Sequence, residues 1–123
     1  MTALKVENPG RGTTLAIHVS VADSWWARFR GLLSHPPLLR GEGLLLRPCR
    51  AIHTHGMRYP IDVAFLDRDD RVTALYHNLM PGRSTRWHWK ARAALELSAG
   101  TLGAAGTQVG DTLRWTPVTE RTA

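Results

Sequence analysis

Several side chains of the kind that bind metal ions lie close together in one segment of the chain. Cys49 is followed by His53 and His55, and Asp62 comes a few residues later. Zinc sites take about four such sulfur, nitrogen and oxygen donors. In an extended strand, residues of equal parity point to one face, so a strand over residues 49–57 would present Cys49, His53 and His55 together. These three residues are therefore candidate metal ligands, with zinc as the candidate cofactor.

A metal site is one of three interpretations of this segment. The spacing of the cysteine and the two histidines matches no standard zinc signature, and a lone cysteine is often a small core residue. The same side chains could instead line a polar pocket that binds a ligand without a metal. The sequence leaves a metal site, a metal-free pocket and a purely structural role open.

Two carboxylates lie in apolar surroundings. Asp62 and Glu96 each have apolar neighbours on both sides. An unpaired charge is costly in such a place, so each side chain must be hydrogen-bonded, ion-paired or directed into a cavity. If both lay on adjoining strands near Arg28, the three would form a network that is either a fold determinant or the polar floor of a binding pocket. Paired carboxylates also serve as general acid and base, at separations that the sequence does not give.

Aromatic and basic side chains are interleaved in another segment. Trp87 and Trp89 enclose His88, and basic residues flank the three on both sides, namely Arg83, Arg86, Lys90 and Arg92. Such a segment can stack on bases or sugars while the arginines hold phosphate, or it can close onto the core as a lid. Trp87 is therefore a candidate ligand contact.

The charge balance is basic, with 16 Lys plus Arg against 10 Asp plus Glu, a net charge of +6 and a pI near 10.7. The basic residues are spread singly, and no window holds a run of five or more like charges. We therefore expect weak, salt-sensitive, sequence-independent association with nucleic acid, and specific nucleic-acid binding is not expected. Motifs of nucleotide-binding loops, serine hydrolases and zinc proteases are missing from the sequence.

The elements that position these residues are mostly strands. Alternating or short apolar segments between turn residues predict strands at six places: 14–21, 44–46, 61–66, 72–77, 93–97 and 112–116. Apolar residues at helical spacing predict one short helix over about residues 23–33, and residues 100–110 hold at most one helical turn. Strands and helices do not alternate. We expect a mainly β fold, a small antiparallel β-barrel or sandwich with one short helix.

The length of 123 residues suits a single domain spanning residues 1–123. With 43% hydrophobic and 21% charged residues, the composition is that of an ordinary globular protein. One cysteine excludes an intrachain disulfide, and no secretory leader is recognisable, so we expect a cytoplasmic protein. The longest pure apolar run is three leucines, far below the roughly 20 residues that cross a bilayer, so no membrane association is expected.

Short motifs occur in a recognisable order along the chain. They are Arg28-Phe29-Arg30-Gly31-Leu32-Leu33, Gly41-Glu42-Gly43-Leu44, Ile52-His53-Thr54-His55-Gly56-Met57, Pro60-Ile61-Asp62-Val63 with Phe65 and Asp67, Pro81, Leu95-Glu96-Leu97 with Gly100, and Gly110-Asp111. Together they resemble the uncharacterised family called domain of unknown function 192, over about residues 19–115. The resemblance implies a small mainly β domain with a short helix and implies no agreed reaction.

The chain departs from this family at one motif. Many members have a Phe-Trp-Met-Lys-Asn-Thr segment before the Pro-x-Asp, and this chain has two histidines, His53 and His55, in the corresponding stretch. Our leading hypothesis is an accessory or binding module that holds a small polar or anionic ligand near residues 53–62. The alternatives are a metal-assisted hydrolase that uses Cys49 with the two histidines, and a structural or interaction domain.

Overall fold

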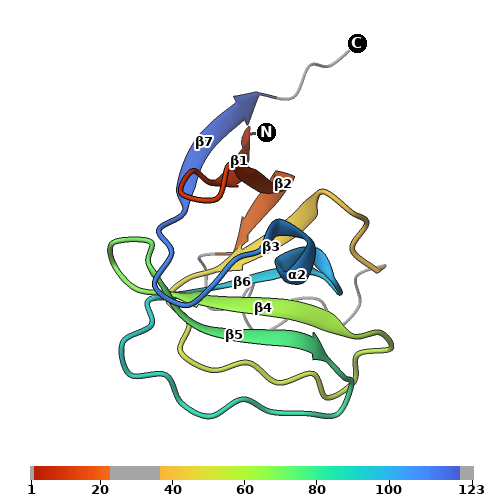
Figure 1. The fold of residues 1–123 in the computed structure, drawn as a ribbon. Coiled ribbons are helices and arrows are strands. Elements are labelled where there is room, and N and C mark those ends of the chain that lie inside the picture. The colour runs from red at the N-terminus through yellow and green to blue at the C-terminus, as the bar shows by residue number, and fades with distance from the viewer. Residues whose placement is uncertain (1, 23–36, 120–123) are drawn as a thin grey trace.

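Seven strands of one sheet are the main regular elements of the computed structural model, which describes residues 2–22 and 37–119 (Figure 1). In chain order they are β1 (Thr2–Asn8), β2 (Thr13–Ala22), β3 (Glu42–Leu46), β4 (Ile61–Leu66), β5 (Val72–Leu79), β6 (Ala93–Ser98) and β7 (Arg114–Thr119). A short helix, α2 (Thr101–Ala105), lies between β6 and β7. The helix expected over about residues 23–33 lies outside the described residues.

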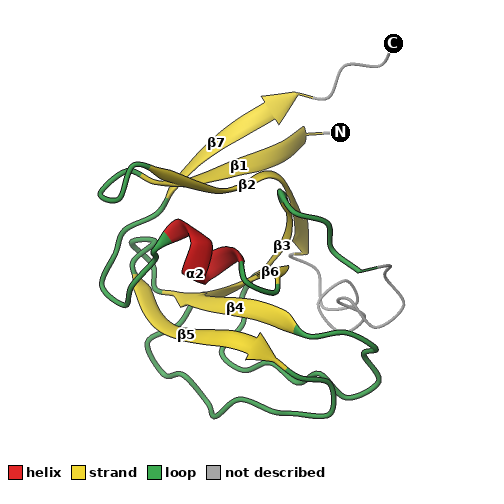
Figure 2. Ribbon diagram, turned by 45° about the vertical axis from the view of Figure 1, so that its right-hand side comes forward, coloured by secondary structure: helices red, strands yellow, loops and turns green. Residues whose placement is uncertain are grey.

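The order of strands across the sheet is β5-β4-β6-β3-β2-β1-β7. All neighbouring pairs are antiparallel except β2 and β3, which are parallel. The sheet is bent so that β1, β2 and β7 form one half and β4 and β5 the other, with α2 between the halves (Figure 2). The predicted mainly β fold is confirmed, as an open, mixed sheet that does not close into a barrel.

The concave side of the sheet holds an inner core. Its largest fully buried members are leucines from β4, β6 and α2, namely Leu66, Leu95, Leu97 and Leu102, and Val6 of β1 and Val19 of β2 are fully buried beside them. Burial of large apolar side chains is the main source of stability in a fold of this size. Because α2 contributes Leu102 to this core, the helix is held between the two halves of the sheet.

The opposite side of the central strands holds an outer core. Val63 and Phe65 of β4 belong to it, whereas Ala64 and Leu66 belong to the inner core. This alternation explains why all six residues of β4 are buried, as the sequence predicted for a strand covered on both faces. The connections that follow β3 and β5 supply the cover, through Ile52, Met57 and Ala91.

Those two connections, which we call the two-loop layer (residues 49–59 and 80–91), run side by side below β5 in Figure 1. Backbone N–H groups of Thr54, Thr85 and His88 donate across the layer to the carbonyls of Arg83, Ile52 and Arg50, respectively. The expected strand over residues 49–57 is wrong, because only His53 makes a β-bridge there and the chain turns at residues 55 and 56. Apart from an isolated bridge at Ser84, residues 80–91 form neither a helix nor a strand.

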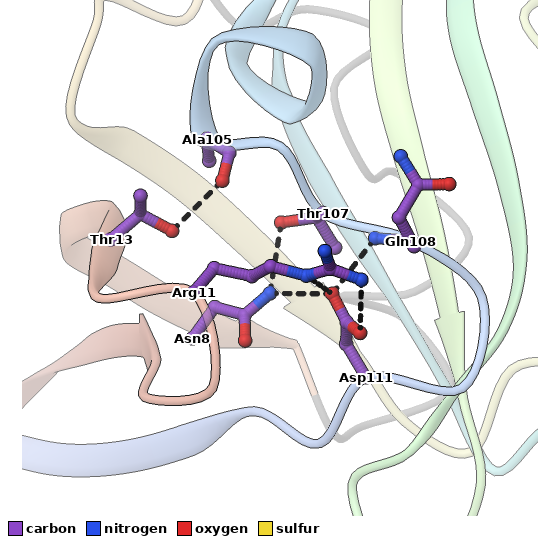
Figure 3. Close-up of polar contacts among 7 residues, drawn as sticks. All are labelled: Asn8, Arg11, Thr13, Ala105, Thr107, Gln108 and Asp111. Atoms are coloured by element: carbon purple, nitrogen blue, oxygen red, sulfur yellow. Dashed lines mark hydrogen bonds and ion pairs between the residues drawn. The ribbon is translucent and has the colours of Figure 1, made fainter.

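The turn between β1 and β2 is fastened to the loop after α2 (Figure 3). Arg11 donates two hydrogen bonds to the Asp111 carboxylate, at 3.0 and 3.1 Å, and Asn8 donates a third at 2.9 Å. The Gln108 N–H donates to the same carboxylate at 2.9 Å. The Arg11 and Asn8 hydrogen bonds hold the pKa of Asp111 well below its usual range. This cluster fixes the segment that leads into β7.

Candidate functional site

The two predicted histidines lie on the surface of the two-loop layer. Both are exposed, whereas their neighbours Ile52 and Thr54 are buried, so the predicted sharing of one face holds for His53 and His55. Their ring centroids are 5.6 Å apart, and His55 Nε2 lies 3.2 Å from Ser84 Oγ. The pair is accessible to a ligand from solvent.

Cys49 is not brought together with the histidines into a metal site. Its Sγ donates to the Ala51 carbonyl at 3.3 Å, and its backbone N–H donates to the Arg92 carbonyl. Within residues 2–22 and 37–119, no three His, Cys, Asp or Glu side chains are grouped closely enough to hold a metal ion. The zinc interpretation required Cys49 to share one strand face with the two histidines. Residues 49–57 do not form a continuous strand, so this shared face does not exist.

Asp62 is fully buried, and both oxygens of its carboxylate accept hydrogen bonds from backbone N–H groups. Its Oδ1 accepts the N–H of Asn78 at 2.8 Å, and its Oδ2 accepts the N–H groups of Gly100 and Leu102 at 3.1 and 2.9 Å. Two of these N–H groups belong to the first turn of α2, where backbone donors have no partner within the helix. Asp62 therefore joins β4, β5 and α2. Of the two roles considered for it, a fold determinant and the floor of a binding pocket, these contacts support the first.

Glu96 is buried without such partners. The residue is only 4% exposed, and its Oε2 has no hydrogen-bond partner within the described part of the chain. Burial raises the pKa of Glu96 to about 8, so the folded protein holds this side chain protonated at neutral pH. Burial, together with the charge of Glu96, also raises the pKa of the nearby Tyr59 phenol. The apolar neighbours of Glu96 in the sequence had already indicated that its carboxyl group lies in apolar surroundings.

The two carboxylates point to opposite faces of the sheet. They do lie on adjoining strands, but Asp62 is in register with Leu97 and Glu96 with Val63. Leu97 belongs to the inner core and Val63 to the outer core, so the sheet itself separates the two acids. The structure does not bring them together as an acid–base pair or as a shared pocket floor. Arg28, the third member of the expected network, lies outside the described residues.

Trp87 lies on the two-loop layer with half of its surface exposed. The neighbouring His88 points inward, with its Nε2 2.7 Å from the Tyr76 hydroxyl and its ring centroid 4.2 Å from that of Phe65. Burial lowers the pKa of His88, and the charge of Arg86 lowers it further. A lid whose tryptophans close onto the core is not formed, because Trp87 and Trp89 are exposed and only His88 between them is buried. A ligand contact remains open for Trp87.

A groove of about 800 Å³ lies where β3 and β4 end and β6 begins. The strand directions place these three ends together, because β6 is antiparallel to both of its neighbours. Arg47 follows β3, Arg68 lies in the β4–β5 turn, and Arg92 precedes β6. Trp115 and Pro117 of β7 form the opposite wall. The sequence analysis missed this site, since its residues form no motif along the chain.

The three arginines of the groove have unused donors. None of the guanidinium groups of Arg47, Arg68 and Arg92 forms a hydrogen bond or an ion pair with another of the described residues. A second hollow, about 540 Å³ beside α2, has a single charged lining residue, Arg40. Of these two hollows among the described residues, the first is the one lined by several cationic residues.

Two acidic residues, Asp67 and Asp70, also line this groove. Oδ1 of Asp67 accepts the backbone N–H groups of Asp69 and Arg71, at 2.8 and 3.0 Å, and so fixes the β4–β5 turn. The pKa of Asp70 is raised, chiefly by burial, against opposing effects of Trp115 and Arg47.

Comparison with known proteins places most of this chain within one sequence family. The profile of DUF192, described as an uncharacterised ACR, matches residues 6–115. A UPF0127 protein of Pyrococcus furiosus is 32% identical over 111 residues, covering 88% of this chain and 95% of the relative. A UPF0127 protein of Thermococcus sibiricus is 29% identical over 120 residues, covering 94% and 77%.

Two crystal structures share the fold. A protein of unknown function from Novosphingobium aromaticivorans superposes with a TM-score of 0.78 at 20% identity, over 92% of this chain and 84% of the other. A Sinorhizobium meliloti protein, provisionally described as a transcription regulator, superposes with a TM-score of 0.78 at 21% identity, over 94% of both chains. In the described residues of this chain, no helix is long and apolar enough to cross a membrane.

Proposed function

The chain belongs to the DUF192 family, and we propose that this member is a binding module that holds a small anionic ligand between Arg47, Arg68 and Arg92. The observation that carries the proposal is that one groove is lined by three arginines whose guanidinium groups form no hydrogen bond or ion pair with another of the described residues. Guanidinium groups match carboxylate and phosphate oxygens with paired donors. The groove therefore suits a ligand that carries one of these groups.

The groove supports binding better than the residues near 53–62 do. There the histidines are exposed and Asp62 is already saturated by three backbone N–H groups. In the groove, the Trp115 ring and Pro117 supply apolar surface beside the three cations. A small number of polar groups against an apolar wall is the usual construction of a ligand site. The small anionic ligand of the leading hypothesis is thus kept, in a different place.

Inorganic pyrophosphate and citrate test the proposal, one for each class of anion. We expect at least one of them to bind the protein in isothermal titration calorimetry. A hydrogen bond to a charged group contributes about 1.5–3 kcal/mol. Arg68→Ala and Arg92→Ala each remove such donors, so each should reduce the affinity for the anion by about tenfold or more. The anion that binds more tightly identifies phosphate or carboxylate as the group recognised.

Arg40→Ala is the matched control, because it removes the same charge from the other hollow. This variant should bind the anion as the wild type does. If Arg40→Ala weakens binding as much as the groove variants, the anion responds only to net charge. That result, or the lack of binding by either anion, contradicts the proposal.

A further inference from the structure

Two large aromatic side chains project from the two-loop layer into solvent. Trp87 is 51% exposed and Trp89 is 80% exposed. Their ring centroids lie 5.9 Å apart, with the ring planes inclined by 71°. Because the rings meet edge to face and are not stacked, each ring keeps at least one face that the other does not cover. Each ring can therefore receive a separate planar group.

The outward position of the tryptophans is imposed by the residue between them. His88 is anchored inward by the Tyr76 hydroxyl and by the Phe65 ring, and its backbone N–H donates to the Arg50 carbonyl at 2.8 Å. Trp87 and Trp89, on either side of this buried residue, are exposed, and a turn follows in which the Ala91 N–H donates to the His88 carbonyl at 3.1 Å. The two rings thus stand on an anchored backbone, which lowers the entropy lost when they bind a partner.

The charge around the tryptophans has one sign. Residues 49–59 and 80–91 contain five cationic side chains and no carboxylate, and the five are Arg50, Arg58, Arg83, Arg86 and Lys90. Arg86 and Lys90 lie immediately beside the two tryptophans in the sequence and are exposed. Although the basic residues are dispersed along the chain, the pairing of the two loops collects these five in one layer. This layer is distinct from the groove, which is lined by other arginines.

We propose that the two-loop layer binds single-stranded nucleic acid without sequence preference. Bases would stack on Trp87 and Trp89 while the neighbouring cations neutralise phosphates. Stacking needs unpaired bases, which a duplex does not offer, and aromatic rings accept any base. The described part of the layer presents no helix for a major groove, so base-edge recognition is not expected. Four of the five cations are arginines, whose planar donors suit phosphate oxygens.

The test compares an oligonucleotide of about 20 thymidines with an abasic strand of the same length. Both strands carry the phosphates, but only the first carries bases. We expect the wild type to bind the thymidine strand more tightly by fluorescence anisotropy, with affinity falling as salt rises. The double variant Trp87→Ala/Trp89→Ala should lose tenfold or more of its affinity for the thymidine strand and bind the two strands alike.

Two control variants separate stacking from other effects. Ile17→Ala truncates an exposed apolar side chain elsewhere, and Arg40→Ala removes a charge outside both the two-loop layer and the groove. Both should bind the thymidine strand as the wild type does. Circular dichroism checks that the tryptophan variant is folded. An unchanged affinity of the folded tryptophan variant, or equal binding of both strands by the wild type, overturns the proposal. Binding of phosphatidylglycerol vesicles but not of the thymidine strand would overturn it in favour of a membrane surface.

Discussion

Asp62→Ala is expected to lower the free energy of unfolding by roughly 3 kcal/mol or more. The substitution removes the acceptor of three backbone N–H groups, those of Asn78, Gly100 and Leu102. Leaving a buried donor unsatisfied costs about 1–3 kcal/mol, and water cannot easily replace an acceptor at a fully buried position. Loss of this carboxylate should loosen α2 and the end of β5 together.

Urea unfolding of the wild type and variants measures this effect. Asp62→Asn preserves the shape but replaces one acceptor oxygen by an NH₂ group, which would face a backbone donor, so it should also destabilise strongly. His53→Ala is the comparison at an exposed site and should cost under about 1 kcal/mol. If His53→Ala proves as damaging as Asp62→Ala, the ordering derived from burial and hydrogen bonding is wrong.

Glu96→Gln, in contrast to Asp62→Ala, is expected to raise the free energy of unfolding relative to the wild type as the pH rises from 4 to 7. Folded Glu96 keeps its proton up to about pH 8, whereas an unfolded glutamate loses it near pH 4.5. Stability from the protonated form is therefore fully present below pH 4.5 and is lost as the pH rises through 8. Because glutamine cannot ionise, the variant escapes this loss. Relative to the wild type, it should gain on the order of 3 kcal/mol between pH 4 and pH 7.

The measurement is the urea midpoint of both proteins at several pH values from 4 to 9, converted to free energies. Asp69→Asn neutralises an exposed carboxylate and should show no comparable gain. Comparing the change with pH cancels the cost of burying the amide itself, which is present at every pH. A difference between Glu96→Gln and the wild type that stays constant from pH 4 to pH 7 would show that Glu96 is ionised in the fold.

Local pattern predicted those parts of the molecule that local chemistry determines. The apolar run at residues 61–66 indicated a strand buried on both faces, and β4 has that environment. The need of Asp62 for partners was also visible, because only its immediate neighbours were required to see it. Which face each carboxylate takes could not be predicted, since the answer depends on the register between β4 and β6.

The groove was invisible to sequence patterns for a similar reason. Arg47, Arg68 and Arg92 are separated from one another by about 20 residues or more along the chain and share no spacing rule, and Trp115 of β7 lines the same groove. The zinc hypothesis failed to gain support because it assumed one continuous strand over residues 49–57. The backbone there is hydrogen-bonded to residues 80–91 as a pair of loops. Of the residues expected to share one face, only His53 and His55 do so.

The pairing of β7 with β1 has a consequence for the nascent protein during translation. β1 can pair with β2 soon after both leave the ribosome, but its other side finds its partner only when residues 114–119 have been made. Until then the unpaired side of β1 is an open edge, which is the kind of surface that recruits foreign strands. Trp115 and Pro117 arrive with the same strand, so the anion groove acquires its last wall at the moment that this edge is covered.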